Sequence, residues 1–170
     1  PPASNNNHLS KFVKHTRDDH DSDEMVARRF FISESAISKL RETVVGEVCF
    51  RPSRVELVIA FMWRVFIDVC QRKNDGRLRP SLLSVPMNLR GKIDFPKYEN
   101  SFGNLAIEVP VKFIPGETRI DLHDIILLLR DVIQKTSVSF AKATNNEIFS
   151  LATKFHEEIQ EWEGNEQVDV

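Results

Sequence analysis

PSRVELVIAFMWRVFIDVC, residues 52–70, is the stretch of this sequence that decides the fold. Its proline and Ser53 are typical of a helix start, and Glu56 follows Ser53 by three residues, which is the spacing of a capping box. From there on, apolar side chains point in nearly every direction, and the charged ones share one narrow stripe on which Arg64 and Asp68 can pair. The pattern predicts a central helix that is packed on several sides. It carries too many charges to cross a membrane.

Length, charge and cysteine content set the class of protein. A chain of 170 residues has the size of one domain, and a net charge of −2 gives no basic excess for binding nucleic acid. Cys49 and Cys70 are too few and too far apart for a disulfide framework or a zinc site, and they indicate the thiols of a reducing compartment. We therefore expect a cytoplasmic protein without nucleic-acid or membrane partners.

The first residues have the composition of a connector. Residues 1–26 are rich in Asn, Ser, Asp and His and show no hydrophobic period, so we expect a solvated linker there, a domain over 27–164 and a frayed tail over 165–170. The histidines and aspartates of the linker could form a metal cluster, but their mixed spacing favours the linker, and we predict no metal site. Because the chain begins with two prolines and no methionine, we expect it to be a piece of a longer polypeptide.

The remaining elements alternate in type along the chain. We expect a short strand over 28–32, a helix that begins at Ser33 and strands over 81–87 and 105–113, then a helix over 121–143 and a last helix capped by Asn145 or Asn146. In the second long strand the apolar residues alternate strictly with the others, which places Pro110 on the solvent side. The fold class is α+β or mixed α/β, and so small a sheet usually takes further strands from elsewhere.

Four of these segments together resemble a known family. They are RRFFISESAISKLR at 28–41, PSRVELVIAFMWR at 52–64, VPMNLRGKIDFPKYENSFGNL at 85–105 and the long helix after them. In this order they resemble the second half of the plant BAHD acyl-CoA-dependent acyltransferases, and the helix start resembles the alkaloid-acetylating branch. The family's short motifs stand here as Met62-Trp63, Asn88-Leu89-Arg90 and Gly103-Asn104. Each motif is weak alone, and their order and spacing make the resemblance specific.

The resemblance implies a fold and an activity. The fold is part of a two-domain chloramphenicol-acetyltransferase-like architecture, with an incomplete sheet flanked by about four helices. The activity is transfer of an acyl group, acetyl by branch resemblance, from acyl-CoA to a hydroxyl of a plant specialised metabolite such as an alkaloid. Acyl-CoA is a co-substrate, and no permanently bound cofactor is expected.

The catalytic motif of the family, HxxxDG, is not matched by this chain. His15 and Asp19 have the spacing, but His20 stands where the family has glycine, and no apolar strand precedes them. We therefore predict no catalytic residue here, and we expect the chain to be inactive alone. Companion fragments of the same enzyme are expected to carry HxxxDG and the equally absent DFGWG. The complete enzyme is expected to be a monomer that acts on a small-molecule alcohol.

The resemblance places acyl-CoA near the start of the central helix. Phosphates of CoA need cations and free N–H groups, which Arg51, Ser53 and Arg54 can supply. The other predicted CoA-side residues are Asn88, Arg90 and Asn104.

Each of these residues also has a plain structural explanation. Ser53 can simply cap the helix while Arg51 and Arg54 are solvated. Asn88 and Arg90 can clamp the loop that follows them, which is the interpretation we favour for that pair. Gly103 is expected to serve a backbone conformation that glycine adopts easily. Tyr98 and Phe102 either border the acceptor pocket or pack beneath the loop. The alternative for the whole chain is a non-catalytic protein-interaction domain.

Overall fold

The computed structural model describes residues 29–44, 46, 50–93, 103–165 and 167–169. The chain divides into two units, Pro1–Phe31 and Ile32–Val170. In the first unit the structure describes residues 29–31, which form neither helix nor strand. The strand expected over 28–32 is therefore wrong for its described residues, because a strand needs a pairing neighbour and these residues pair with none in the described part of the chain.

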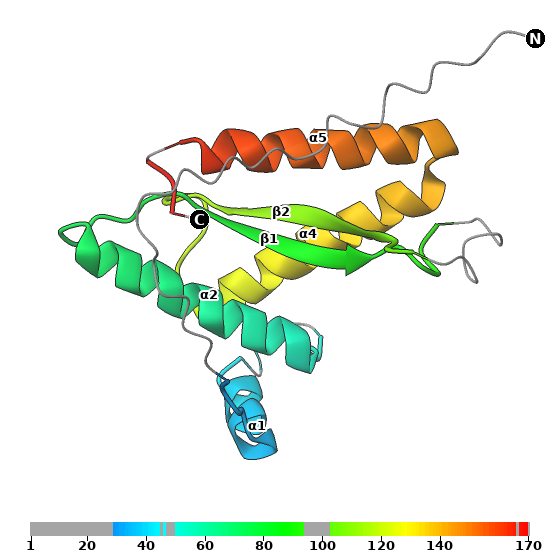
Figure 1. Ribbon diagram of the computed structural model, residues 1–170. Coiled ribbons are helices and arrows are strands. Elements are labelled where there is room, and N and C mark those ends of the chain that lie inside the picture. The colour runs from blue at the N-terminus through cyan, green and yellow to red at the C-terminus, as the bar shows by residue number, and fades with distance from the viewer. Residues whose placement is uncertain (1–28, 45, 47–49, 94–102, 166, 170) are drawn as a thin grey trace, which may run out of the picture. The chain divides into compact units, whose positions relative to one another are not determined.

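The second unit contains helices and strands in the order expected. Among the described residues these are α1 (Glu34–Glu42), α2 (Arg54–Lys73), β1 (Ser81–Asn88), β2 (Ala106–Phe113), α4 (Leu122–Lys142) and α5 (Asn145–Glu163), as drawn in Figure 1. The predicted α+β class, an incomplete sheet flanked by helices, is confirmed. None of the described helices combines the length and the apolar character needed to cross a lipid bilayer.

The sheet is a two-stranded antiparallel ladder. Ser81 lies opposite Phe113, and Asn88 lies opposite Ala106. Asp169 continues the ladder beside β1, because its carbonyl accepts from the Leu82 N–H at 2.9 Å and its own N–H donates to the Pro80 carbonyl at 2.8 Å. The tail over 165–170 is therefore not frayed at Asp169, whose backbone groups supply hydrogen bonds that the edge of β1 would otherwise lack.

Helix α2 begins as predicted, and one of its faces is buried. Leu57, Ala60, Trp63 and Ile67 follow the spacing of one helical face and are all buried. The opposite face is apolar yet exposed: Val55, Met62, Val65, Phe66 and Val69. We call these five residues the outer stripe. Helix α2 thus packs against α1, α4 and the strands, as expected of a central helix, but the outer stripe is left uncovered by the described part of the chain.

Asp68 pairs with Arg72 rather than with Arg64. The distance between the Asp68 carboxylate and the Arg72 guanidinium is 2.7 Å. Both arginines stand four residues from Asp68, and the pair with the acid nearer the N-terminus has the more favourable orientation in a helix.

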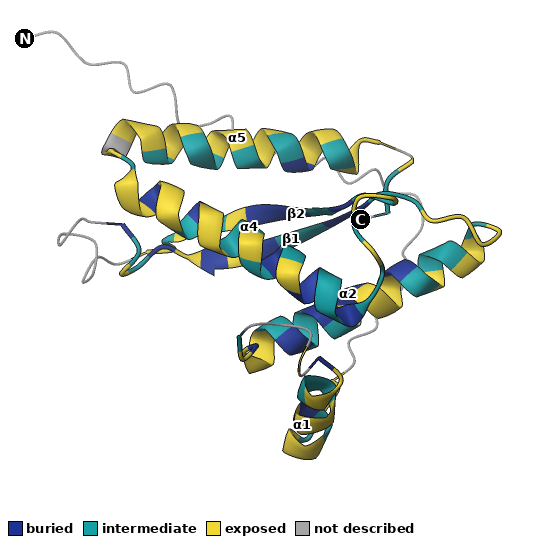
Figure 2. Ribbon diagram, turned by 180° about the vertical axis from the view of Figure 1, so that it is seen from behind, coloured by how far each residue is buried: buried dark blue, intermediate teal, exposed yellow. Residues whose placement is uncertain are grey.

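Both faces of β2 are covered. Val111 and Phe113 belong to a buried cluster with Leu57 and Trp63 of α2 and Ile125 of α4, which Figure 2 shows in dark blue. On the other face, Lys112 binds Glu158 of α5, and its ammonium lies 4.7 Å from the centre of the Trp162 ring. Pro110 is consequently buried, and its predicted place on the solvent side is wrong, because α5 packs against β2.

Thr144, rather than Asn145 or Asn146, is the N-cap of α5. The backbone N–H of Thr144 donates to the Glu147 carboxylate at 2.7 Å, and the Thr144 hydroxyl donates to it at 2.8 Å. These bonds lower the pKa of Glu147. Glu147 stands three residues after Thr144, which is the capping-box spacing, and this pairing selects the helix start.

The burial of Trp63 gives a first prediction. Its side chain is 3% exposed, and its indole N–H donates to Ser81 Oγ at 3.0 Å. We expect Trp63→Ala to lower the free energy of unfolding by about 3–5 kcal/mol, because it leaves a large cavity. Trp63→Phe should cost about 1–3 kcal/mol, since it leaves the buried Ser81 hydroxyl without its donor. Urea unfolding measures both.

The matched control for Trp63 is Met62→Ala, on the exposed face of the same helix. It should change the free energy of unfolding by no more than about 0.5 kcal/mol. Equal losses for Trp63→Ala and Met62→Ala would contradict the orientation of α2.

Candidate functional site

The start of α2 is fixed by a reciprocal capping box. The Ser53 hydroxyl accepts from the Glu56 N–H at 3.1 Å, and the Glu56 carboxylate accepts from the Ser53 N–H at 2.7 Å. Ser53 therefore does act as the cap. Since a hydroxyl that accepts one hydrogen bond keeps its own proton, Ser53 can still donate to a ligand.

Glu56 has a second partner from a distant part of the chain. The Arg130 guanidinium of α4 donates to the two Glu56 carboxylate oxygens, at 3.1 and 3.4 Å. The same guanidinium lies 3.8 Å from the centre of the Phe50 ring. The two charged side chains are 30% and 17% exposed, so solvent screens the pair only in part. Arg130 thus joins α4, the first turn of α2 and the segment that precedes it.

Two cations at this helix start are available to a ligand. Arg51 and Arg54 are exposed, and neither forms an ion pair with any residue in the described ranges. The positive end of the α2 dipole adds to their field. The N–H of Ser53 is already occupied by Glu56, so an anion at this place would be held mainly by the two arginine side chains.

Asn88 and Arg90 form a clamp on the loop that follows β1. Asn88 Oδ1 accepts from the Arg90 N–H at 3.0 Å, and the Arg90 guanidinium donates to the Gly103 carbonyl at 2.5 Å. The Leu89 N–H donates to the Leu105 carbonyl at 2.9 Å. Gly103 has φ +124°, a conformation that favours glycine, as expected. These contacts fit the structural explanation of Asn88 and Arg90. A contact of either residue with acyl-CoA stays a prediction.

The other predicted residues of this region are less constrained. Asn104 is exposed and makes no hydrogen bond to the described part of the chain. Tyr98 and Phe102 lie outside the described residues, as do His15 and Asp19. No group of three or more His, Cys, Asp or Glu side chains within the described ranges has the arrangement of a metal site. Burial raises the pKa of the Cys70 thiol, which disfavours a nucleophilic thiolate there.

The fold brings the predicted residues to one end of the second unit. Helix α2 and strand β1 follow each other and run in opposite directions, so α2 begins at the end where β1 stops (Figures 1 and 2). Arg51, Ser53 and Arg54 come from the helix start, while Asn88, Arg90 and Asn104 flank the loop between the strands. Sequence reasoning missed Arg130 and Glu56 as a pair, because no local pattern connects residues so far apart.

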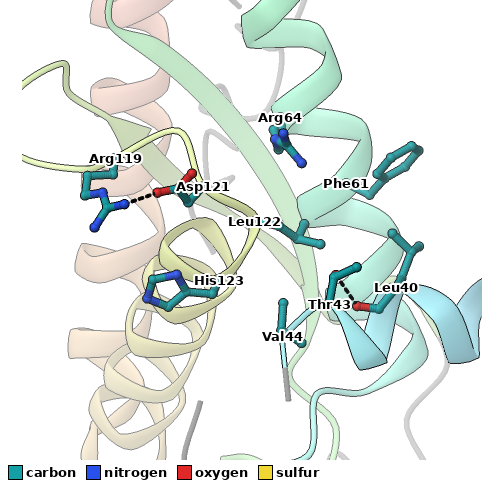
Figure 3. Close-up of a pocket in the computed structure, with 9 residues that line it drawn as sticks. All are labelled: Leu40, Thr43, Val44, Phe61, Arg64, Arg119, Asp121, Leu122 and His123. Atoms are coloured by element: carbon teal, nitrogen blue, oxygen red, sulfur yellow. Dashed lines mark hydrogen bonds and ion pairs between the residues drawn. The ribbon is translucent and has the colours of Figure 1, made fainter. Parts of the chain in front are cut away.

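A separate hollow of about 470 Å³ lies among α1, α2 and the start of α4. Figure 3 shows Phe61 and Arg64 from α2 together with Arg119, Asp121 and His123 at its edge. Two carboxylates contact the basic side chains here, because Arg119 binds Asp121 at 2.5 Å and His123 lies 3.1 Å from Asp124. None of the predicted CoA-side residues lines this hollow.

Comparisons with known proteins point to one family. The model of the Transferase family matches residues 1–162. Among curated relatives, acetyl-CoA-benzylalcohol acetyltransferase of Clarkia breweri is 36% identical over 93 residues, which are 49% of this chain and 22% of that protein. (13S,14R)-1,13-dihydroxy-N-methylcanadine 13-O-acetyltransferase AT1 of Papaver somniferum is 32% identical over 99 residues, 55% of this chain and 20% of that protein. The chain thus spans about a fifth of the length of these relatives.

The fold has a solved counterpart. The crystal structure of vinorine synthase matches with a TM-score of 0.55 and 23% identity, over 81% of this chain and 30% of that one. At this identity the likeness speaks for the fold alone, and it agrees with the predicted partial two-domain architecture.

The clamp at the end of β1 gives a second prediction. Arg90→Ala removes the donor to the Gly103 carbonyl, and we expect the free energy of unfolding to fall by about 1–3 kcal/mol. Proteolysis between residues 91 and 103 should become faster, because the hydrogen bond that joins Arg90 to Gly103 is lost. Asn104→Ala is the matched control beside Gly103 and should stay within about 0.5 kcal/mol of the wild type. Equal stability of both variants would argue against the clamp.

Proposed function

This chain belongs to the Transferase family, the BAHD acyltransferases that its motifs resemble, and we propose from this premise that it forms the acyl-CoA side of an enzyme that acylates a hydroxyl group. The observation that carries the proposal is the start of α2, where two exposed arginines stand beside a capped helix N-terminus. The family supports the reaction class, and the two exposed cations support an anionic co-substrate at this helix start.

The chemistry of CoA matches that place. CoA carries phosphates on a long flexible molecule, and Arg51 and Arg54 offer fork-shaped donors to phosphate oxygens. The Ser53 hydroxyl adds a neutral donor between them. In this proposal Asn88, Arg90 and Asn104 border the same end of the unit, with the clamp of Asn88 and Arg90 shaping the loop there.

The donor and acceptor in the proposal follow the relatives. Their names speak of acetyl transfer to benzyl alcohol and to the 13-oxygen of 1,13-dihydroxy-N-methylcanadine, so we infer acetyl-CoA as the donor and a small plant alcohol as the acceptor. The reaction is one acyl transfer in a ternary complex. A histidine base takes the proton of the alcohol, and the alcohol oxygen attacks the thioester carbonyl. Hydrogen-bond donors stabilise the resulting oxyanion, and CoA then leaves as its thiolate.

The base in this mechanism comes from outside the present sequence. The chain lacks an HxxxDG motif and a DFGWG motif, so the proposal includes companion segments of the same enzyme that carry them. The outer stripe of α2 is an apolar surface that such a segment can cover. With the companion in place, we expect a monomeric enzyme in the cytoplasm, where the two cysteines stay reduced.

A binding measurement tests the CoA side directly. Isothermal titration of the chain with CoA should give a Kd that rises about tenfold or more for Arg51→Glu and for Arg54→Glu, because each reverses a charge beside a phosphate. Arg72→Glu makes the same charge change at the far end of α2 and should alter the Kd by less than about twofold. In an active enzyme, the apparent KM for acyl-CoA should rise more than the KM for the acceptor. Equal effects of all three variants would remove the helix start from the site.

An activity measurement tests the need for the companion. The purified chain should transfer no acetyl group from acetyl-CoA to benzyl alcohol, because it contains no HxxxDG histidine base. The His15→Ala variant should likewise transfer no acetyl group. A chain that transfers acetyl alone and loses the activity on His15→Ala would overturn this part of the proposal and make His15 the base.

A further inference from the structure

We propose that Arg130 is a positioning residue for CoA, because it neutralises the Glu56 carboxylate that caps the very helix start at which the phosphates would bind. This inference rests on the proposed function. It adds a residue of another helix, α4, that touches no ligand and acts through Glu56.

The conflict that Arg130 resolves is electrostatic. The Glu56 carboxylate holds the Ser53 N–H at 2.7 Å, so a negative charge occupies one of the donors that would favour an anion. A full negative charge at this place is favourable for the helix, but it cancels part of the positive field of the helix start and repels a phosphate held by Arg51 and Arg54. The Arg130 guanidinium, at 3.1 and 3.4 Å from the two carboxylate oxygens, cancels that charge.

The geometry keeps this compensation in place. The Arg130 guanidinium lies against the Phe50 ring at 3.8 Å, and Phe50 directly precedes Arg51. Glu56 is only 17% exposed, so solvent and salt screen its charge incompletely. A second ion pair on α4, Lys135 with Asp131, is 76% and 55% exposed and touches no helix cap, so it lacks this role.

The pattern of variants distinguishes compensation from simple structural support. Arg130→Gln should weaken CoA binding by about three- to tenfold, because it exposes the phosphate to a bare carboxylate. Glu56→Gln keeps the capping geometry, since glutamine also serves in a capping box, and it frees a positive charge, so CoA should bind at least as tightly as to the wild type. The double variant should return to within about twofold of the wild type.

The experiment is titration calorimetry of the full chain with CoA and with pantetheine, which carries no phosphate, at low and high salt. Lys135→Gln is the matched control, because it removes one positive charge from an exposed pair on the same helix, and it should stay within about twofold of the wild type. The loss in Arg130→Gln should be absent with pantetheine and should shrink as salt rises. Thermal melting verifies that each variant is folded.

Each outcome has one meaning. A double variant as weak as Arg130→Gln, an equal loss with pantetheine, or an unchanged Kd in Arg130→Gln would overturn the inference while the proposed function stands. Absence of CoA binding by the wild type would overturn both. Should Arg130→Gln fail to fold, Glu56→Gln decides alone: binding more than about threefold weaker than the wild type refutes compensation, and equal or tighter binding supports it.

Discussion

The hydrogen bond from the Trp63 indole to the Ser81 hydroxyl is the contact on which the arrangement of the second unit depends. It joins the middle of α2 to the first residue of β1 in a place without solvent, where an unpaired donor or acceptor would be costly. Ser81 also lies opposite Phe113 of β2 and beside Asp169. One buried polar pair thus fixes how helix, hairpin and chain end meet, while the apolar residues around it supply the bulk of the burial.

The direction in which α2 runs relative to β1 has consequences for where the predicted site residues lie. Because the helix and the strand run in opposite directions, the helix start and the loop after β1 lie at one end of the unit. The Ser53 cap holds the backbone at the helix start, and the hydrogen bond from Arg90 to Gly103 holds it after β1. A co-substrate that binds to these held segments would lose less binding free energy to ordering their backbone.

If CoA binds at the helix start as proposed, Glu56 stabilises the helix and opposes the ligand at the same time. A glutamate at the third position of a helix is favourable for capping, yet its charge has the wrong sign for a phosphate site. In our proposal Arg130 removes this conflict, and its hydrogen bond to Glu56 leaves the cap intact. Arg130 also packs on the ring of Phe50, which is itself packed against the buried cluster.

The sequence by itself determined the helices, the two long strands, the family and the capping box at Ser53, whereas it placed a strand over 28–32 and the cap of α5 at Asn145 or Asn146 wrongly. The capping box at Ser53, the alternation of apolar residues in the strand over 105–113 and the short family motifs each depend on neighbours within a few residues, so a local pattern in the sequence can reveal them. Tertiary structure alone decided which face of α2 is buried, why Pro110 is covered by α5, that Asp169 extends the sheet and that Arg130 reaches Glu56. Those features join residues that are far apart in sequence, and the free energy that selects them comes from packing between elements, which no local pattern records.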